Sequence, residues 1–163
     1  MKRSILAIAA AIACSSLPLV STAAEPPNAA QMAPLQYLLG TWHCTWTDGT
    51  NSGAEDQVFE TALDGAWLQE KEVVTNAAGA QMVQSVHYTG YDPHTKSYMH
   101  VGPDADGGYE IARSADGDVW HDMSNPNSSF VHRKLSDTAR SMAESYTAGG
   151  KSVTLKMSCK KVS

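Results

Sequence analysis

Two histidines in the second half of the chain have the residue type that could bind a metal ion or a haem. His121 lies in phase with Val119 and Met123, and His132 lies in phase with Phe130. They fall on consecutive predicted strands, so both could point into one interior, where two neutral imidazoles are the beginning of a metal or haem site. Zinc sites need three or four ligands, and the spacing supplies no third. Hydrogen-bonded or surface histidines are therefore the alternative.

Aromatic residues offer further contacts for an organic ligand. Trp46 could stack on a ligand or belong to the core, and the hydroxyl groups of Tyr88 and Tyr98 could orient a ligand headgroup or cover the ends of the fold. With His121 and His132 these three form the candidate ligand-binding set. No catalytic residue is predicted, because the chain has no Ser-His-Asp order, phosphate-binding glycine loop or nucleophile elbow. No metal site or cofactor is predicted either. Haem stays open as an alternative.

Short alternating runs divided by turn residues indicate an antiparallel β-fold that would hold these side chains. Gly, Asp, Asn and Pro recur at intervals of roughly ten residues, which is typical of a sandwich or barrel. We predict ten strands in one domain, preceded by a flexible leader at 25–34 and a single helical turn, "LQYLLG", that ends at Gly40. The segment "DADGGYE" at 104–110 lacks the ligands of a calcium loop and is predicted to be a hairpin turn.

The first and last predicted strands carry a cysteine each. Trp42, Cys44 and Trp46 share one face of "TWHCTWT", and Cys159 lies on the apolar face of "KSVTLKMSCKKV". Because an up-and-down barrel closes when its last strand pairs with its first, the two inward thiols would lie within reach of a disulfide. The bond would close a loop of about 116 residues, for which the chain-entropy model gives about 4–5 kcal/mol. Two unrelated buried thiols are the alternative.

The first 24 residues have the features of a secretory signal peptide. Lys2 and Arg3 precede an apolar run that is short for a membrane span, and small residues precede the cut, which we place after Ala24. Cleavage after Ala23 is nearly as good. Acylation of Cys14, as in a lipoprotein, is disfavoured because the usual upstream leucine is missing. We therefore expect a periplasmic or secreted protein, a setting in which an even pair of cysteines favours a disulfide.

Charge and length exclude several classes of partner. The 163 residues include 12 basic and 17 acidic ones, for a net charge of −5. Loss of Lys2 and Arg3 with the signal leaves about 139 residues and a net charge of about −7. An anionic chain without a basic stripe does not favour nucleic acid or acidic lipid surfaces. No later stretch has the ~20 apolar residues of a spanning helix.

The segment "LLGTW" resembles the start of the calycin barrels, the superfamily of lipocalins and fatty-acid-binding proteins. Together with "DGAWL" at 64–68 and "YTGYDPHTKSY" at 88–98, it is similar to a group of bacterial lipocalin-like domains of unknown function. The resemblance covers about residues 35–161. It implies structural roles for Gly40 and Trp42, with Trp42 packed across a closed end and an open end that admits a small molecule. Haem-binding nitrobindins have glycines where this chain has Cys44 and Trp46. The resemblance therefore does not imply that this chain binds haem.

Three hypotheses for the function remain. The leading one is an exported, all-β lipocalin-like barrel of about ten strands, at residues 35–163, that binds a small, largely apolar molecule. The second is haem or metal binding through His121 or His132. The third is a non-enzymatic envelope interaction protein with a packed interior. A non-enzymatic role is favoured.

Overall fold

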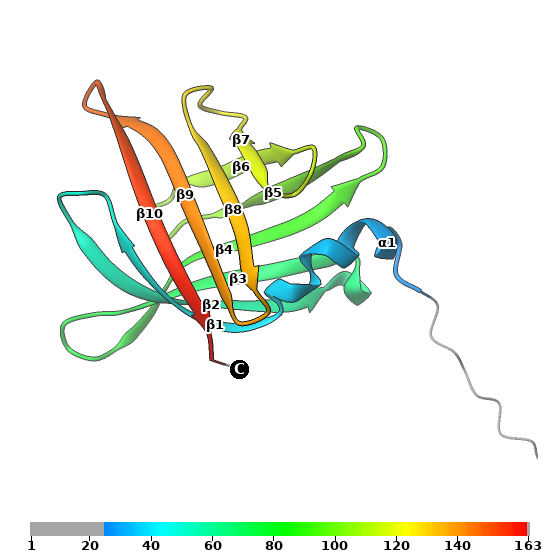
Figure 1. Cartoon of the computed structure of the whole chain (residues 1–163), viewed down its shortest axis with the longest axis horizontal. Helices are drawn as coiled ribbons and strands as arrows, with labels where there is room; N and C mark the ends of the chain where they lie inside the picture. Colours follow the sequence, from blue (N-terminus) through cyan, green and yellow to red (C-terminus); the bar gives the residue numbers. More distant parts are fainter. Residues whose placement is uncertain (1–24, 163) are drawn as a thin grey trace, which may run out of the picture.

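The computed structural model describes residues 25–162, which form an antiparallel barrel with a short helical segment at one end (Figure 1). The predicted signal peptide lies outside the described residues. Within the described part, no helix has the length and apolar character needed to cross a membrane. In chain order the elements are α1 (Ala29–Met32), η1 (Ala33–Leu38), β1 (Gly40–Thr47), β2 (Ser52–Ala62), η2 (Leu63–Gly65), β3 (Trp67–Thr75), β4 (Gln81–Asp92), β5 (Ser97–Pro103), β6 (Tyr109–Ser114), β7 (Val119–Asp122), β8 (Ser129–Ser136), β9 (Ala139–Ala148) and β10 (Lys151–Lys161).

The sheet closes on itself, as predicted. Each strand pairs antiparallel with its neighbour in sequence, and β10 returns to pair with β1. In that pairing Cys44 lies directly opposite Cys159. Their sulfur atoms are bonded across a sequence separation of 115 residues, and both side chains are buried. The ten-stranded up-and-down barrel and the predicted disulfide are both confirmed.

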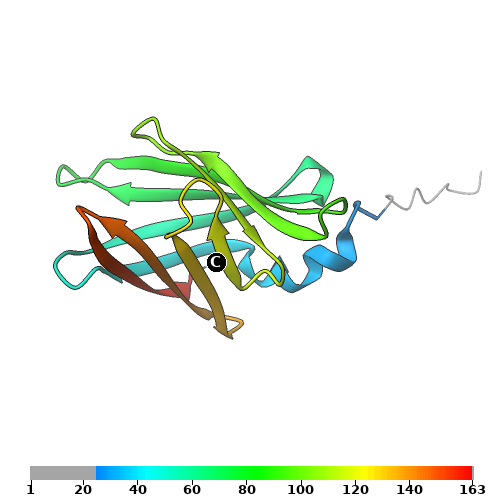
Figure 2. The same cartoon turned by 90° about the horizontal axis from the view of Figure 1, so that it is seen from above.

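The helical segment and Trp42 cover one end of the barrel. Trp42 is fully buried, and its indole N–H donates a 2.6 Å hydrogen bond to the carbonyl of Leu38. Leu35 packs against the β6–β7 turn at Gly117, whose φ of +85° suits a glycine and where a Cβ would lie 3.3 Å from the leucine methyl. Two views show the helical segment at this end and the tips of the β1–β2, β3–β4 and β9–β10 hairpins at the other (Figures 1 and 2).

The segment predicted as a flexible leader differs from that prediction. Residues 29–32 form a helical turn, and Met32 at its end is only 1% exposed. Asn28 holds the start of this turn by donating a side-chain hydrogen bond to the carbonyl of Tyr91. The segment has a polar, proline-containing composition, which is typical of a loose leader. Burial of Met32 and the hydrogen bond of Asn28 nevertheless hold it against the barrel.

Over the middle of the sheet, polar side chains face the interior. On β4, Ser85, His87 and Thr89 are buried, whereas Val86 and Tyr88 between them are partly exposed. Strands β3 and β5 place Glu70 and His100 inward in the same way. Below this level, Trp120 and Phe130 stack with ring planes 10° apart. The barrel therefore has an aromatic layer toward its closed end and an ionisable layer above it.

Candidate functional site

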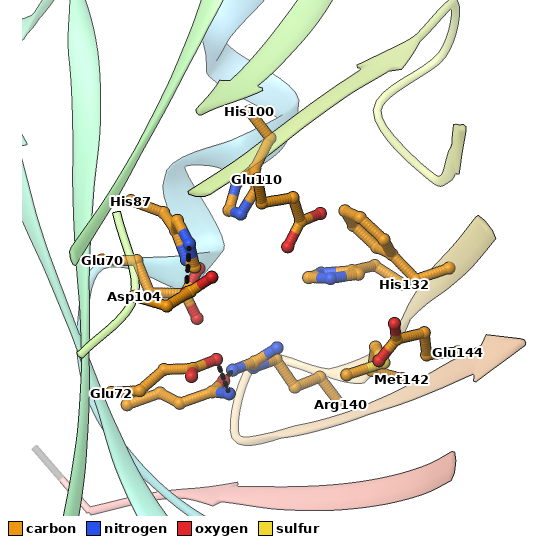
Figure 3. Close-up of a pocket in the computed structure, with 12 residues that line it drawn as sticks. Glu70, Glu72, His87, His100, Asp104, Glu110, His132, Arg140, Met142 and Glu144 are labelled. Carbon is orange, nitrogen blue, oxygen red and sulfur yellow. Dashed lines mark hydrogen bonds and ion pairs between the residues drawn. The ribbon is translucent and has the colours of Figure 1, made fainter. Parts of the chain in front are cut away.

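A cavity of about 170 Å³ lies within the ionisable layer, enclosed by β2 to β6 and by β8 and β9 (Figure 3). Side chains from seven strands and from the turn after β5 point into this cavity. The interior is therefore not completely filled by side chains. Carboxylates and imidazoles predominate in its lining. The lining residues are Gln57, Glu70, Glu72, His87, His100, Asp104, Glu110, Phe130, His132, Arg140, Met142 and Glu144.

Three buried side chains from adjacent strands converge on one wall of this cavity. Glu70 of β3 lies directly opposite His87 of β4 in the sheet register, and His100 of β5 follows on the next strand. One ligand atom of each residue lies within 4.8 Å of the others. Thr89 Oγ1 and His100 Nδ1 share a 2.9 Å hydrogen bond. That bond orients the ring and leaves Nε2 of His100 as the nitrogen available to a ligand.

His87 carries an unsatisfied nitrogen although it is only 4% exposed. Its Nε2 has no hydrogen-bond partner within the described part of the chain. The nearest carboxylate oxygen, Oδ1 of Asp104, lies 3.3 Å away but without the alignment of a hydrogen bond. Leaving such a group unpaired costs about 1–3 kcal/mol. The hairpin turn predicted within 104–110 is confirmed by the hydrogen bonds between Asp104 and Gly107 and between Asp104 and Gly108, and it brings Asp104 to this site.

A single arginine lies below the carboxylates. Arg140 of β9 is 1% exposed and donates a hydrogen bond to the side-chain oxygen of Gln57. Its guanidinium carbon lies 5.3 Å from the centroid of the Trp42 ring and 5.1 Å from that of Phe59. These distances are those of cation–π contacts. Arg140 thus contacts Trp42 and Phe59 toward the closed end of the barrel and also lines the acidic cavity.

Burial and mutual repulsion raise the pKa values of the interior carboxyl groups. Desolvation, with the charge of Glu72 as the second cause, raises the pKa of Glu55 to about 7. The same two causes raise the pKa of Glu70. Desolvation and the charge of Glu144 raise the pKa of Glu110 to about 8. Near neutral pH the cavity therefore holds several carboxyl groups that release protons easily once a cation enters.

The interior histidines are shifted in the opposite direction. Desolvation, followed by the positive charge of Arg140, lowers the pKa of His132 to about 3. Desolvation, followed by the neighbouring His87 and His132, lowers the pKa of His100 well below its usual range. His100 and His132 are therefore neutral at physiological pH, which is the form in which imidazole binds metals.

These shifts predict that the ligand-free barrel loses stability as the pH rises from about 6.5 to about 8. The folded chain holds the protons of Glu55 and Glu110 more tightly than the unfolded chain, so their contribution is lost as the pH passes through about 7 and about 8. The lowered pKa values of His100 and His132 affect the stability only below about pH 6.5, the pKa of a histidine in the unfolded chain. Urea unfolding at both ends of this range measures the effect. E55Q/E110Q should flatten the profile, and a wild-type profile that rises with pH would contradict the assignment.

A second pocket, of about 370 Å³, lies on the mouth side of the inner cavity and shares Glu72, Met142 and Glu144 with it. Trp46 forms one wall. Its indole lies over Gly53 on β2, where a Cβ would come within 2.6 Å of the ring. The volume falls within the roughly 300–1,000 Å³ of small-molecule sites, whereas the inner cavity is smaller. The full lining is Trp46, Glu55, Glu72, Val74, Gln84, Met142, Glu144, Leu155 and Met157.

The five candidate ligand-binding residues do not come together. Trp46 lines the outer pocket and His132 lines the inner cavity. Tyr98 is buried at the closed end, where its hydroxyl donates to the carbonyl of Gln31. Tyr88 lies on the opposite face of β4 from His87, and its hydroxyl accepts a hydrogen bond from Gln69. Neither tyrosine lines the inner cavity or the outer pocket.

The expectation that His121 and His132 point toward each other is wrong. His121 is exposed and pairs in register with Ser129, whereas His132 lies inside the barrel. On β7 the inward residue is Trp120, and Val119 is 38% exposed. Val119 and Met123, the apolar residues in phase with His121, therefore lie on the outside of the barrel.

Sequence reasoning missed Glu70, His87, His100 and Arg140. The signal was present in part, because Glu70 and Glu72 alternate in phase with Leu68, which is buried. Charged residues on the buried side of a strand indicate a functional interior. On β4 no such signal existed, since Val86 and Tyr88 made the other face the apolar one.

The topology, the helical turn and the buried Trp42 define the fold as a ten-stranded up-and-down barrel that is closed at one end by a helical segment. No protein-family model matches the chain, and no curated protein matches it. Among solved structures the chain is similar to lobster apocrustacyanin A1, with 8% sequence identity and a TM-score of 0.41. The match covers 82% of this chain and 66% of that chain, just under two thirds of its length. At this identity the similarity says nothing about function.

Proposed function

We propose that the barrel is a binding protein for a small organic cation that also carries an apolar group. The observation that supports this most directly is the outer pocket. Glu55, Glu72 and Glu144 line it together with Trp46 and Leu155. An ammonium group would face the carboxylates, and the rest of the ligand would contact the indole and the aliphatic side chains.

Electrostatics favour a cation over other ligands of the same size. Burial, and after it the negative charge of Glu72, raises the pKa of Glu55. A cation removes that repulsion and allows the groups to ionise. A hydrogen bond to a charged group contributes about 1.5–3 kcal/mol. The face of Trp46 adds a cation–π contact or an apolar surface, depending on how the ligand lies.

The predicted apolar ligand is retained only in part by this proposal. A wholly apolar molecule would strip water from the carboxylates and return no hydrogen bonds, which is costly. An amphipathic amine satisfies both kinds of wall. The disulfide supports an oxidising compartment, and export remains part of the proposal. Haem binding and an interaction role for the outer face stay predictions.

Calorimetric titration with three matched probes tests the proposal: 2-phenylethylamine, 2-phenylethanol and 3-phenylpropanoate. The amine should bind at least about tenfold more tightly than the alcohol, and the carboxylate should bind weakest. E55Q/E144Q should remove most of the preference for the amine. E60Q is the matched control, because Glu60 is exposed on the outer face and pairs with Lys71. Equal affinity for amine and alcohol would contradict the proposal.

Binding of the amine should strengthen as the pH rises from about 6 to about 8. The amine keeps its charge over this range, while Glu55, with a pKa of about 7, loses its proton. Glu72 and Glu144 line the same pocket, and the charge of Arg140 lowers the pKa of Glu55. The guanidinium stays charged over this pH range. The affinity of E55Q should depend less on pH than that of the wild type. An affinity that falls with rising pH would contradict the role given to Glu55.

A further inference from the structure

We propose that Glu70, His87 and His100 form a binding site for a divalent transition-metal ion of the zinc type. Two imidazoles and one carboxylate are the donor set of many sites in which the protein supplies three ligands and leaves a position open. The three ligand atoms already lie within 4.8 Å of one another, so small side-chain rotations suffice to close on one ion. The site stands independently of the proposed amine pocket.

The scaffold of this site is rigid. Its ligands come from three adjacent strands, β3, β4 and β5, whose register fixes Glu70 opposite His87. Each side chain is buried, with exposures of 6% for Glu70, 4% for His87 and 7% for His100. Sites built on strands hold their geometry better than sites built on loops. The outer side of the wall is the closed sheet, so an ion would be approached from the cavity.

The hydrogen bond between Thr89 and His100 is the kind of support that metal-binding histidines have. When His100 Nδ1–H donates to Thr89 Oγ1, Nε2 of His100 carries the lone pair that a metal ion can bind. An outer hydrogen bond of this kind fixes both the tautomer and the ring orientation. The ring centroids of His87 and His100 lie 4.7 Å apart, and the two rings are tilted rather than stacked.

Two of the three ligands have no hydrogen-bond partner in the described part of the chain. Glu70 forms no side-chain hydrogen bond or ion pair within residues 25–162, and Nε2 of His87 has no hydrogen-bond partner there. A buried carboxyl and a buried imidazole without partners reduce stability. A bound ion satisfies both at once. Asp104 has a carboxylate oxygen 3.3 Å from His87 Nε2, but it does not belong to the group of ligand atoms that lie within 4.8 Å of one another.

The open side of the site faces the centre of the cavity, toward Glu110 and His132 (Figure 3). The cavity volume of about 170 Å³ accommodates an ion with a few waters, at about 30 Å³ for each water. The carboxylates of the outer pocket lack a neighbouring imidazole in their lining. Nitrogen donors therefore single out the inner wall as the position for a transition metal.

Zinc and cobalt titrations of the chelator-treated protein test this site. We expect one equivalent per chain to bind, with a visible cobalt spectrum that zinc abolishes. E70Q, H87A and H100A should each weaken binding by at least about 100-fold, and Thr89→Val by about tenfold. H121A and H43A are matched controls on the outer face, where the effect should stay within about twofold.

Thermal unfolding keeps the test decisive if a variant folds poorly. Without metal, E70Q should be at least as stable as the wild type, because it removes an ionisable group that has no partner. Saturating zinc should raise the melting temperature of the wild type but not that of E70Q. The proposal is overturned if the wild type binds no stoichiometric ion, or if H121A or H43A, rather than the three inner variants, abolishes binding.

E70Q should still bind 2-phenylethylamine, and E55Q/E144Q should still bind zinc, so failure of one site is distinguishable from failure of the other.

Discussion

Replacing both cysteines by alanine is expected to lower the melting temperature by roughly 12–20 °C. The disulfide joins the first strand to the last across 115 residues, so in the unfolded chain it closes a loop that includes most of the barrel. Chain entropy gives such a loop about 4–5 kcal/mol of stabilisation. C44A/C159A removes this constraint on the unfolded state while leaving two small side chains inside.

Differential scanning calorimetry of the double variant measures this effect better than reduction of the native protein. Cys44 and Cys159 are 0% and 3% exposed, so a reductant reaches the bond mainly after unfolding. Unfolding in the presence of a reductant should lower the stability of the wild type and leave C44A/C159A unchanged. A decrease of less than about 5 °C in the double variant would mean that closure of the barrel depends little on the bond.

Replacing Arg140 by methionine is expected to cost about 1.5–3 kcal/mol of stability near pH 8, the contribution of a buried hydrogen bond to a charged group. The variant keeps an apolar stem against Trp42 and Phe59 but removes the buried positive charge. The charge of Arg140 lowers the pKa values of Glu55 and Glu70, opposing the upward shift caused by burial. Without it, ionisation of these groups in the folded state becomes more costly.

The pH dependence separates loss of this charge from loss of packing. Near pH 6 more of the interior carboxyl groups are protonated, so R140M should be closer in stability to the wild type than near pH 8. Urea unfolding at the two pH values measures the difference. Arg133 is exposed on β8, and R133M should change stability by less than about 0.5 kcal/mol at either pH. An equal loss for R140M at both pH values would assign its role to packing alone.

The sequence was sufficient to predict the architecture because the information it required was local. Glycine, aspartate and asparagine at the hairpin turns set the number of strands, and Gly49, Gly79, Gly107 and Gly149 adopt the positive φ that such turns favour. The inward phase of Cys44 and Cys159 predicted which strands meet. The number of strands depends on neighbouring residues, and the closure of the barrel depends on one pairing of strands. The structure confirms both predictions.

The interior site could be predicted only in part, because the usual inward apolar phase is reversed on some of the strands that form it, such as β4 and β6. On β6, Ile111 and Tyr109 lie on the outer side, and Glu110 lines the cavity. On β7 the same reversal placed His121 outside. Burial of carboxylates and imidazoles depends on partners from several strands, such as Arg140 beside Gln57, which lie far apart in sequence.

Measurement of the protons exchanged when 2-phenylethylamine binds tests most directly the claim that this interior takes up positive charge. Calorimetric titrations near pH 7, in two buffers of different ionisation enthalpy, give that number. We expect release of about half a proton or more for each amine bound, because Glu55, with a pKa of about 7, must ionise to face the ligand. E55Q should release less. Binding without proton release, or with proton uptake, would contradict an acidic interior that accepts a cation.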